Sequence, residues 1–133
     1  MQPENIHRWL STESYWSKGI PFDVVKTAID NSFCIGVLSQ NVQIGFARLV
    51  TDYATFAYLA DVYVVDEHRG QGLSKKMMEL IMSLPWMGTL RRICLATVDA
   101  HGLYTKFGFQ SPAKPDRLLE ITRPMIYGDN SNI

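Results

Sequence analysis

The stretch from Leu59 to Met78 constrains the fold most, because it passes from a strand pattern into a helix pattern through a glycine-containing turn. The residues from Phe56 to Val65 include one charged side chain, which is typical of a central strand covered on both faces. After Gly70, apolar residues recur at helical spacing until Pro85: Leu73, Met77, Leu80, Ile81 and Leu84. Such a junction directs backbone N–H groups and the positive end of a helix at one point. We therefore expect a phosphate or pyrophosphate site there.

The 133 residues are enough for one substantial core, and we predict a single domain over residues 1–133 with a frayed tail from about residue 128. Lys and Arg total 13, as do Asp and Glu, so no charge field favours a nucleic-acid or anionic membrane partner. The N-terminus lacks a signal-peptide pattern, and no apolar run is long enough to span a membrane. We expect a cytoplasmic protein with no nucleic-acid and no membrane partner.

The cysteines and histidines do not form a recognisable metal or redox motif. Cys34 and Cys94 lie in separate apolar runs, so two buried free thiols are the expectation, set against a redox or metal role. The three histidines, His7, His68 and His101, have no metal-ligand spacing. We predict no metal site.

The other apolar patterns predict an α+β fold with α/β/α layers. We expect strands at Ile6–Leu10, Phe33–Ser39, Val42–Val50, Arg91–Val98 and Leu118–Thr122, a helix from Pro21 to before Asn31, and a short helix from Ala100 to Phe107, capped by Asp99 and ended by Gly108. The strand, helix, strand order around Gly70 implies a right-handed crossover between parallel strands. Together these elements predict a mixed, mostly antiparallel central sheet of about six strands with helices on both faces.

The loop Arg69-Gly70-Gln71-Gly72-Leu73-Ser74 differs from two well-known phosphate loops. It lacks the G-x-x-x-x-G-K-[ST] spacing, and Lys75 stands where the third glycine of G-x-G-x-x-G belongs. These differences argue against nucleoside triphosphates and nicotinamide cofactors. A plain strand-to-helix connection is the alternative reading of the loop taken alone.

The wider sequence around the loop resembles the acetyl-CoA-binding motif of the GNAT family of N-acetyltransferases. In that motif a strand leads into [QR]-x-x-G-x-[GA] at a helix start. Arg69, Gly72 and Ser74 occupy its three defining positions, with Ser74 replacing the usual Gly or Ala. The resemblance implies the GNAT fold and an acetyl-CoA cosubstrate.

A second match follows about thirty residues later. Leu103 to Phe109, LYTKFGF, is similar to the C-terminal Y-x-K-x-G-F signature of the family. The family often carries an asparagine seven residues before the tyrosine, and Thr97 stands there in this chain. The resemblance covers Val42 to Phe109 well, and the N-terminal third by architecture alone.

The resemblance implies where acetyl-CoA would bind. The loop N–H groups of Gly70, Gln71, Gly72, Leu73, Ser74 and Lys75, with Arg69, would hold the pyrophosphate. Val62, Tyr63 and Val64 match the splayed strand whose free backbone groups pair with the pantetheine arm, and one of their N–H groups would polarise the thioester carbonyl. Lys75 and Lys76 either neutralise phosphate charge or form a solvated helix face.

Two side chains are candidates for the chemistry. Tyr104 matches the position of the general acid in the family's signature. A phenol of pKa about 10 is a suitable proton donor to a thiolate of pKa about 8.5. The alternative for Tyr104 is simple packing on the cofactor. Asp61, isolated in an apolar strand, is a candidate base or amine anchor. Its alternative is a buried ion pair with Arg48 on the neighbouring strand.

The predicted activity is acetyl transfer from acetyl-CoA to a primary amine, of a small molecule or of a protein. A CoA-binding sensory module without turnover is the alternative from another class. Tyr15, Trp16 and Phe22 are expected to cluster in the region that shapes the acceptor site in this family, as an aromatic wall or as core packing. The sequence leaves the acceptor and the oligomeric state open, a homodimer included.

Overall fold

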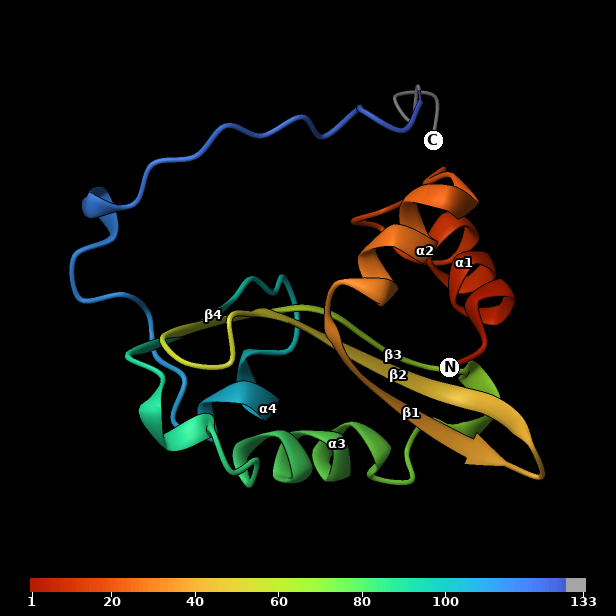
Figure 1. Cartoon of the computed structure of the whole chain (residues 1–133), viewed down its shortest axis with the longest axis horizontal. Coiled ribbons are helices and arrows are strands. Elements are labelled where there is room, and N and C mark those ends of the chain that lie inside the picture. The colour runs from red at the N-terminus through yellow and green to blue at the C-terminus, as the bar shows by residue number, and fades with distance from the viewer. Residues whose placement is uncertain (129–133) are drawn as a thin grey trace.

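Four strands form one sheet in the order β1-β2-β3-β4 in the computed structural model, which describes residues 1–128 (Figure 1). The strands are β1 Phe33–Ser39, β2 Val42–Thr51, β3 Phe56–Val64 and β4 Arg92–Leu95. The first three run antiparallel, and β3 and β4 run parallel. The crossover helix between the parallel strands is α3, Leu73–Met82. The predicted mixed and mostly antiparallel sheet is therefore confirmed.

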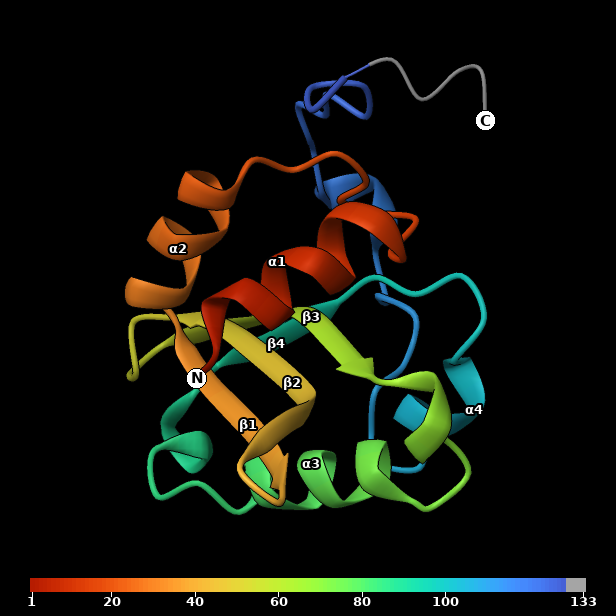
Figure 2. The ribbon, with the colours of Figure 1, turned by 90° about the vertical axis from the view of Figure 1, so that its right-hand side faces the viewer.

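Helices cover both faces of this sheet, as the predicted layers require (Figures 1 and 2). Helices α1, Pro3–Thr12, and α2, Phe22–Asp30, lie on one face, and α3 and the short α4, His101–Thr105, lie on the other. Each face has its own apolar core: Phe46 and Tyr63 pack under α1 and α2, whereas Leu49 and Leu59 pack against α3. Short 3₁₀ turns are found at Asp66–His68, Met87–Thr89 and Pro115–Arg117.

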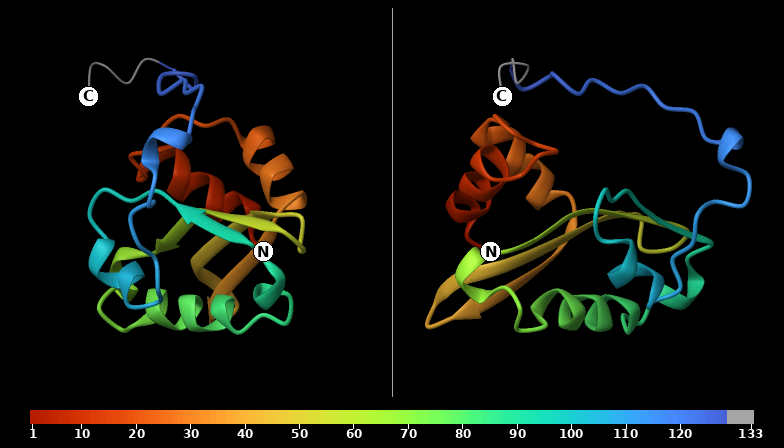
Figure 3. Two further views of the ribbon diagram at one scale, coloured as in Figure 1. Left: turned by 90° about the vertical axis from the view of Figure 1, so that its left-hand side faces the viewer. Right: turned by 180° about the vertical axis from the view of Figure 1, so that it is seen from behind.

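The expectation of about six strands is wrong, because the described residues form four. Ile6–Leu10 belongs to α1: Ile6, Trp9 and Leu10 repeat at helical spacing and are all buried, and Pro3 stands in the first turn. Leu118–Thr122 forms no strand, because no neighbouring strand within residues 1–128 pairs with it; its Leu118 N–H bonds only locally, to the Pro115 carbonyl. The view from behind shows this C-terminal segment arching clear of the sheet (Figure 3).

The two hairpin turns follow from their residues. Gln40 and Asn41 both have positive φ, as a tight two-residue hairpin turn requires. In the β2–β3 turn, Asp52 accepts hydrogen bonds from the backbone N–H groups of Ala54 and Thr55 and from the Thr55 hydroxyl. These bonds hold the pKa of Asp52 well below its usual range. The predicted register of Arg48 opposite Asp61 is present, and it results from this turn together with a shift of one residue between Arg48 and Leu49.

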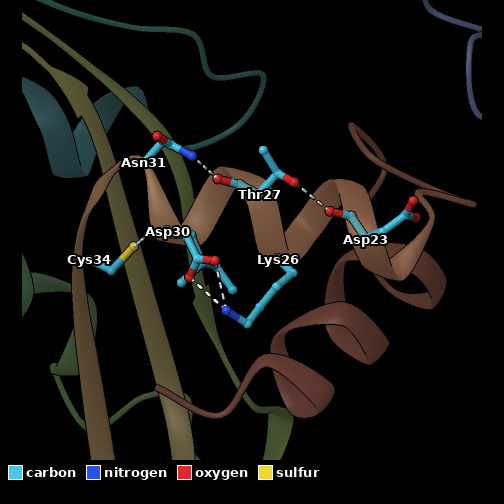
Figure 4. A network of polar contacts seen from close by, with 7 residues as sticks. Asp23, Lys26, Thr27, Asp30, Asn31 and Cys34 are labelled. Atoms are coloured by element: carbon cyan, nitrogen blue, oxygen red, sulfur yellow. Dashed lines mark hydrogen bonds and ion pairs between the residues drawn. The ribbon is translucent and has the colours of Figure 1, made fainter.

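Helix α2 ends before Asn31, as predicted, and its polar contacts are local (Figure 4). The Asn31 amide donates to the Thr27 carbonyl at 2.9 Å, and Lys26 forms an ion pair with Asp30 at 2.7 Å. Cys34 lies just beyond, with its Sγ 3.7 Å from the Ile29 carbonyl oxygen, and burial raises the pKa of its thiol. Cys34 and Cys94 are both free and half-buried.

The second half of the chain departs from expectation in β4, in α4 and on the surface of α3. Strand β4 ends at Leu95 rather than Val98, and α4 is shorter than the predicted Ala100–Phe107. Asp99 does not cap α4; the Thr97 hydroxyl accepts the Ala100 N–H at 3.0 Å instead. Leu80 is 52% exposed, and Met78 is buried in its place.

No helix in residues 1–128 is long and apolar enough to cross a membrane. The predicted frayed tail lies, apart from Gly128, outside the described residues.

Candidate active site

A cleft opens where the parallel strands β3 and β4 diverge. Their pairing covers only Phe56 to Leu59 of β3, whereas β3 continues to Val64 and the chain leaves the sheet after Leu95. The resulting cavity of about 610 Å³ is lined by both diverging segments, by the end of α1, by the start of α3 and by Tyr104. Early divergence therefore explains why β4 is shorter than predicted.

A β-bulge at Ala60 decides which side chains face this cleft. Arg48 pairs with Asp61, and the next residue, Leu49, pairs with Leu59, so Ala60 is an extra residue on β3. An extra residue reverses the alternation of the strand. Val62 consequently packs on the α3 side, whereas Asp61 faces α1 and α2. The bulge thus separates Asp61 from the cleft.

The glycine loop presents free N–H groups at one end of the cleft. Gly70 and Gly72 have φ of +81° and +78°, a conformation that side-chain-bearing residues rarely adopt. Gly72 is the N-cap of α3, and no side chain caps this helix. In residues 1–128 the N–H groups of Leu73, Ser74 and Lys75 have no hydrogen-bond partner. Unpaired donors at the positive end of a helix form an anion site.

Arg69 fastens the loop to the end of β3. Its Nε donates to the Val64 carbonyl at 2.8 Å, and its Nη1 lies 2.8 Å from an Asp66 carboxylate oxygen. The guanidinium also stacks over the Tyr63 ring, 5.3 Å from the centroid. Arg69 lines the cleft, and two of its five N–H donors already bind protein groups. Lys75 and Lys76 are exposed on the surface of α3.

Tyr104 is buried in the wall of the cleft, with its ring edge-on to Phe109. Burial raises the pKa of this phenol above 10, and the nearby Tyr15 and Asp99 add to the shift. No residue in the described part of the chain hydrogen-bonds to the Tyr104 hydroxyl. The site therefore holds a protonated phenol whose O–H is free to bind a ligand.

Asp61 is 5% exposed, and both of its carboxylate oxygens have partners. Arg48 Nε donates to one oxygen at 2.8 Å, and the indole N–H of Trp16 donates to the other at 2.7 Å. The predicted ion pair with Arg48 is present. Asp61 lines a separate cavity of about 100 Å³ under α1 and α2, and the Trp16 side chain joins that region to the main cleft.

Sequence reasoning missed two contacts between the segment that follows α1 and β3. The Trp16 bond to Asp61 spans 45 positions, and the Tyr63 hydroxyl donates to a Glu13 carboxylate oxygen at 2.6 Å across 50. Trp9 also stacks on Tyr63 at 5.0 Å between ring centroids. Burial and the Glu13 carboxylate raise the pKa of Tyr63 to about 12. Contacts at such separation leave no local sequence signal.

The remaining aromatic and histidine candidates are dispersed. Tyr15 and Trp16 are in edge contact, but Phe22 packs against His7, so the predicted cluster of three is wrong. His101 is exposed on α4, and His68 ends the 3₁₀ turn before the loop. Within residues 1–128, no three His, Cys, Asp or Glu side chains lie close enough together to hold a metal ion. The absence of a metal site stays a prediction.

Comparison with known proteins identifies the family of this site. The sequence profile of the acetyltransferase (GNAT) domain matches residues 30–111, which include the sheet, the glycine loop and Tyr104. The chain belongs to the GNAT family. This membership supports acetyl transfer as the general activity.

Relatives of the whole chain support this assignment. A crystal structure of a candidate GNAT acetyltransferase from Xanthomonas campestris pv. campestris is 47% identical, with a TM-score of 0.94, and covers 97% of this chain and 91% of that one. A candidate acetyltransferase of Gibberella zeae is 28% identical, covering 96% of this chain and 84% of that protein.

A more distant structure shares the fold. A candidate acetyltransferase of Clostridium acetobutylicum, solved with acetyl-CoA, is 18% identical, with a TM-score of 0.59, and covers 76% of this chain and 71% of that one. The GNAT fold with a mixed sheet and flanking helices is thus shown for this chain.

Proposed function

We propose that this protein transfers the acetyl group of acetyl-CoA to the primary amine of a small molecule. The observation that carries the proposal is the cleft between β3 and β4, which joins a free helix N-terminus to a buried phenol with a free hydroxyl. Acetyl-CoA has a pyrophosphate at one end and a thioester at the other. An anion site and a proton donor in one cleft match these two ends.

The loop N–H groups from Gly70 to Lys75 bind the pyrophosphate in this proposal. Positive φ at Gly70 and Gly72 turns the backbone so that the first turn of α3 is uncapped, and the space beside both glycines is open. Ser74, which replaces the usual Gly or Ala, lines the cleft, and its hydroxyl is available to a phosphate oxygen. Arg69 positions the loop through its bonds to Val64 and Asp66.

The free edge of β3 binds the pantetheine arm. Beyond Leu59, β3 has no strand beside it on the β4 side in the described chain, so backbone groups on this edge of Val62–Val64 are available for a ligand, except the Val64 carbonyl, which binds Arg69. One backbone N–H on this edge would polarise the thioester carbonyl, as an oxyanion hole does. The family relative from Clostridium acetobutylicum was solved with acetyl-CoA, which supports the same ligand class here.

Tyr104 acts as the general acid. The amine nitrogen attacks the carbonyl carbon, the carbon–sulfur bond breaks, and the departing thiolate takes the Tyr104 proton. Burial keeps the phenol protonated at neutral pH, because it raises the pKa of Tyr104 further. The phenolate regains a proton from solvent, and the amine releases one.

Asp61 acts as a positioning residue, since both carboxylate oxygens hold protein groups. It fixes the Trp16 indole at the cleft and neutralises Arg48. A base or amine-anchor role for Asp61 is the competing assignment, and it requires one of these two bonds to open. The positioning role predicts that substitutions of Asp61 and of Trp16 lower turnover alike. The base role predicts that only substitution of Asp61 changes the shape of the pH–rate profile.

Thiol release from acetyl-CoA, measured with a panel of small amines and with a peptide N-terminus, tests the function. We expect release with a small amine, together with a tryptophan fluorescence change on CoA addition, because Trp16 lines the cleft. A fluorescence change without release for any acceptor would favour the CoA-binding module. Release only with the peptide would favour a protein amino group as acceptor.

A further inference from the structure

The charged side chains that line the main cleft within residues 1–128 are Glu13, Arg69 and Asp99. Two of them already have protein partners. Arg69 forms an ion pair with Asp66, and a Glu13 carboxylate oxygen accepts the hydrogen bond from Tyr63. The Asp99 carboxylate has neither a hydrogen bond nor an ion pair in the described chain. Asp99 is therefore an unpaired negative charge in the wall of the cleft.

The fold gives Asp99 no capping task, although its place before α4 predicts one. At the start of this helix the Thr97 hydroxyl accepts the Ala100 N–H at 3.0 Å instead. Strand β4 ends at Leu95, so the segment that carries Asp99 lies where the cleft has opened. A carboxylate that lines a cleft and has no protein partner attracts cations.

Asp99 lies near the group that we assign to the chemistry. Tyr15 and Asp99 are close enough to Tyr104 that both add to the rise in its pKa. The Tyr104 side chain is only 9% exposed, and its hydroxyl has no partner in the described chain although it borders the same cleft. An unpartnered donor on a buried side chain independently indicates that a ligand occupies this part of the cleft.

Aromatic rings line the cleft together with Asp99. Tyr15 and Trp16 are in edge contact, and the Trp16 indole is fixed by its hydrogen bond to Asp61. A carboxylate beside aromatic rings is a typical arrangement for binding an ammonium group. Arg69 is the one basic side chain that lines the cleft in residues 1–128, and it belongs to the glycine loop. A carboxylate or phosphate on the acceptor would therefore find no cationic partner beside Asp99.

We infer that the acceptor is a diamine, with one amino group reacting beside Tyr104 and the other bound as an ammonium ion by Asp99, Tyr15 and Trp16. This inference rests on the proposed acetyl transfer and names its substrate class. The neutral amino group attacks the thioester carbonyl, the carbon–sulfur bond breaks, and the thiolate takes the Tyr104 proton. The distal ammonium group keeps its proton throughout. Asp99 thus determines specificity and takes no part in proton transfer.

Thiol release from acetyl-CoA with three acceptors of similar chain length tests the substrate class. Putrescine has two amino groups, butylamine has one, and γ-aminobutyrate has a carboxylate in place of the second. We expect kcat/KM for putrescine to exceed that for butylamine by about tenfold, mainly through a lower KM, because a hydrogen bond to a charged group is gained. γ-Aminobutyrate should be the poorest acceptor. Equal values for putrescine and butylamine would overturn the inference and leave acetyl transfer standing.

Substitutions of Asp99 test whether this residue sets the preference. Asp99→Asn should bring the putrescine and butylamine values close together, and Asp99→Lys should favour γ-aminobutyrate over putrescine. Asp116→Asn is the matched control, because Asp116 is exposed in the C-terminal segment, clear of the sheet (Figure 3). It should keep the native preference. Loss of the acidic limb of the pH–rate profile in Asp99→Asn, with both amines alike, would make Asp99 a general base and overturn the inference.

Calorimetric titration of putrescine into the CoA-saturated protein tests the site without turnover. We expect Asp99→Asn to raise the Kd for putrescine by about tenfold and Asp116→Asn to leave it unchanged. Equal Kd values for the native protein and Asp99→Asn would overturn the inference, even if putrescine is acetylated. Binding that depends on Asp99, without thiol release for any amine, would support the ammonium site and overturn the proposed acetyl transfer.

Discussion

The two faces of β3 beyond its bulge differ in how their polar atoms are used. On the α1–α2 face, Asp61 has a partner for each carboxylate oxygen, and the Tyr63 hydroxyl binds Glu13. On the cleft face, the Tyr104 hydroxyl and the first N–H groups of α3 have no partner within residues 1–128. Polar groups without a protein partner that converge on one open cleft are available to a ligand, and such convergence is typical of a binding site.

This contrast assigns architecture to one face and chemistry to the other. A substitution on the α1–α2 face should reduce stability, and it should change turnover only through the folded fraction or through Trp16. A substitution on the cleft face should reduce binding or turnover and leave stability nearly unchanged. The following four substitutions test the division, two on each face.

Tyr104→Phe should give the largest effect on turnover. It removes the proton donor while keeping the ring that packs on Phe109, and loss of a general acid costs about 10²–10⁴-fold in rate. We expect kcat to fall by about 10³-fold with an unchanged melting temperature, measured by thiol release and thermal unfolding. In the native enzyme, turnover should not decline through Tyr104 ionisation until the pH exceeds 10, because burial raises its pKa.

The control for Tyr104→Phe is Tyr53→Phe, which removes a hydroxyl from an exposed tyrosine of the β2–β3 turn that does not line the cleft. Turnover should be unaffected by that change. Equal kcat for native and Tyr104→Phe enzymes would reduce Tyr104 to a packing residue and leave the thiolate to be protonated by solvent.

Asp61→Asn should mainly reduce stability. Breaking a buried ion pair leaves Arg48 unpaired and costs about 3 kcal/mol of unfolding free energy. Arg48→Gln should cost less, because Arg48 is more exposed than Asp61, and the double variant should recover part of the loss. Urea unfolding of the single and double variants measures this coupling.

The same variants separate the positioning role from the base role. If Asp61 positions Trp16, then Trp16→Phe and Asp61→Asn should lower turnover to a similar extent, with the pH–rate profile unchanged in shape. A general base would instead lose the acidic limb of the profile in Asp61→Asn alone. That outcome would assign a catalytic role to Asp61.

Gly72→Ala should weaken acetyl-CoA binding moderately. A residue with a Cβ is strained at φ of +78° by roughly 1–2 kcal/mol, so we expect about a tenfold increase in Kd for CoA, measured by calorimetry. Gly88→Ala is the matched control, because its added Cβ also meets open space and its backbone is not left-handed. Similar Kd values for the two variants would argue that the α3 N-terminus does not hold the pyrophosphate.

The cleft face could be predicted from sequence because its signals are local. The strand, glycine turn and helix from Phe56 to Met82 are consecutive, and the two glycines of the turn, Gly70 and Gly72, have the positive φ that glycine favours. The α1–α2 face could be predicted only in part. The Arg48–Asp61 pair follows from hairpin register, but the bonds from Trp16 and Glu13 connect residues 45 and 50 positions apart.

The errors at the two ends of the chain have different physical causes. At Ile6–Leu10 a short apolar run fits either the strand repeat or the helix repeat, and tertiary packing against β2 and β3 selects the helix. At Leu118–Thr122 the strand pattern is genuine, but a strand requires a neighbour, and none lies beside it in the described chain. The local sequence pattern sets the propensity to form a strand, whereas strand pairing also requires a neighbouring strand that supplies hydrogen-bond partners.

Tyr63→Phe should give the smallest effect at neutral pH and a distinct one in alkali. Removing the bond to Glu13 costs about 1 kcal/mol, and the ring stacked on Trp9 is kept. In the native protein, both folded and unfolded Tyr63 are protonated below pH 10. Between pH 10 and about 12 the unfolded phenol ionises while the folded one does not, so the free energy of unfolding falls as pH rises.

Unfolding free energies measured by urea titration from pH 8 to pH 12 should therefore decline less steeply for Tyr63→Phe than for native protein. Tyr58→Phe is the control, because it removes the hydroxyl of a more exposed tyrosine that has no bond to Glu13. Equal slopes for all three proteins would mean that Tyr63 ionises alike in both states. In that case the bond from Tyr63 to Glu13 would not fasten the residue that follows α1 to β3, and the Tyr63 hydroxyl would be as free for a ligand as the Tyr104 hydroxyl.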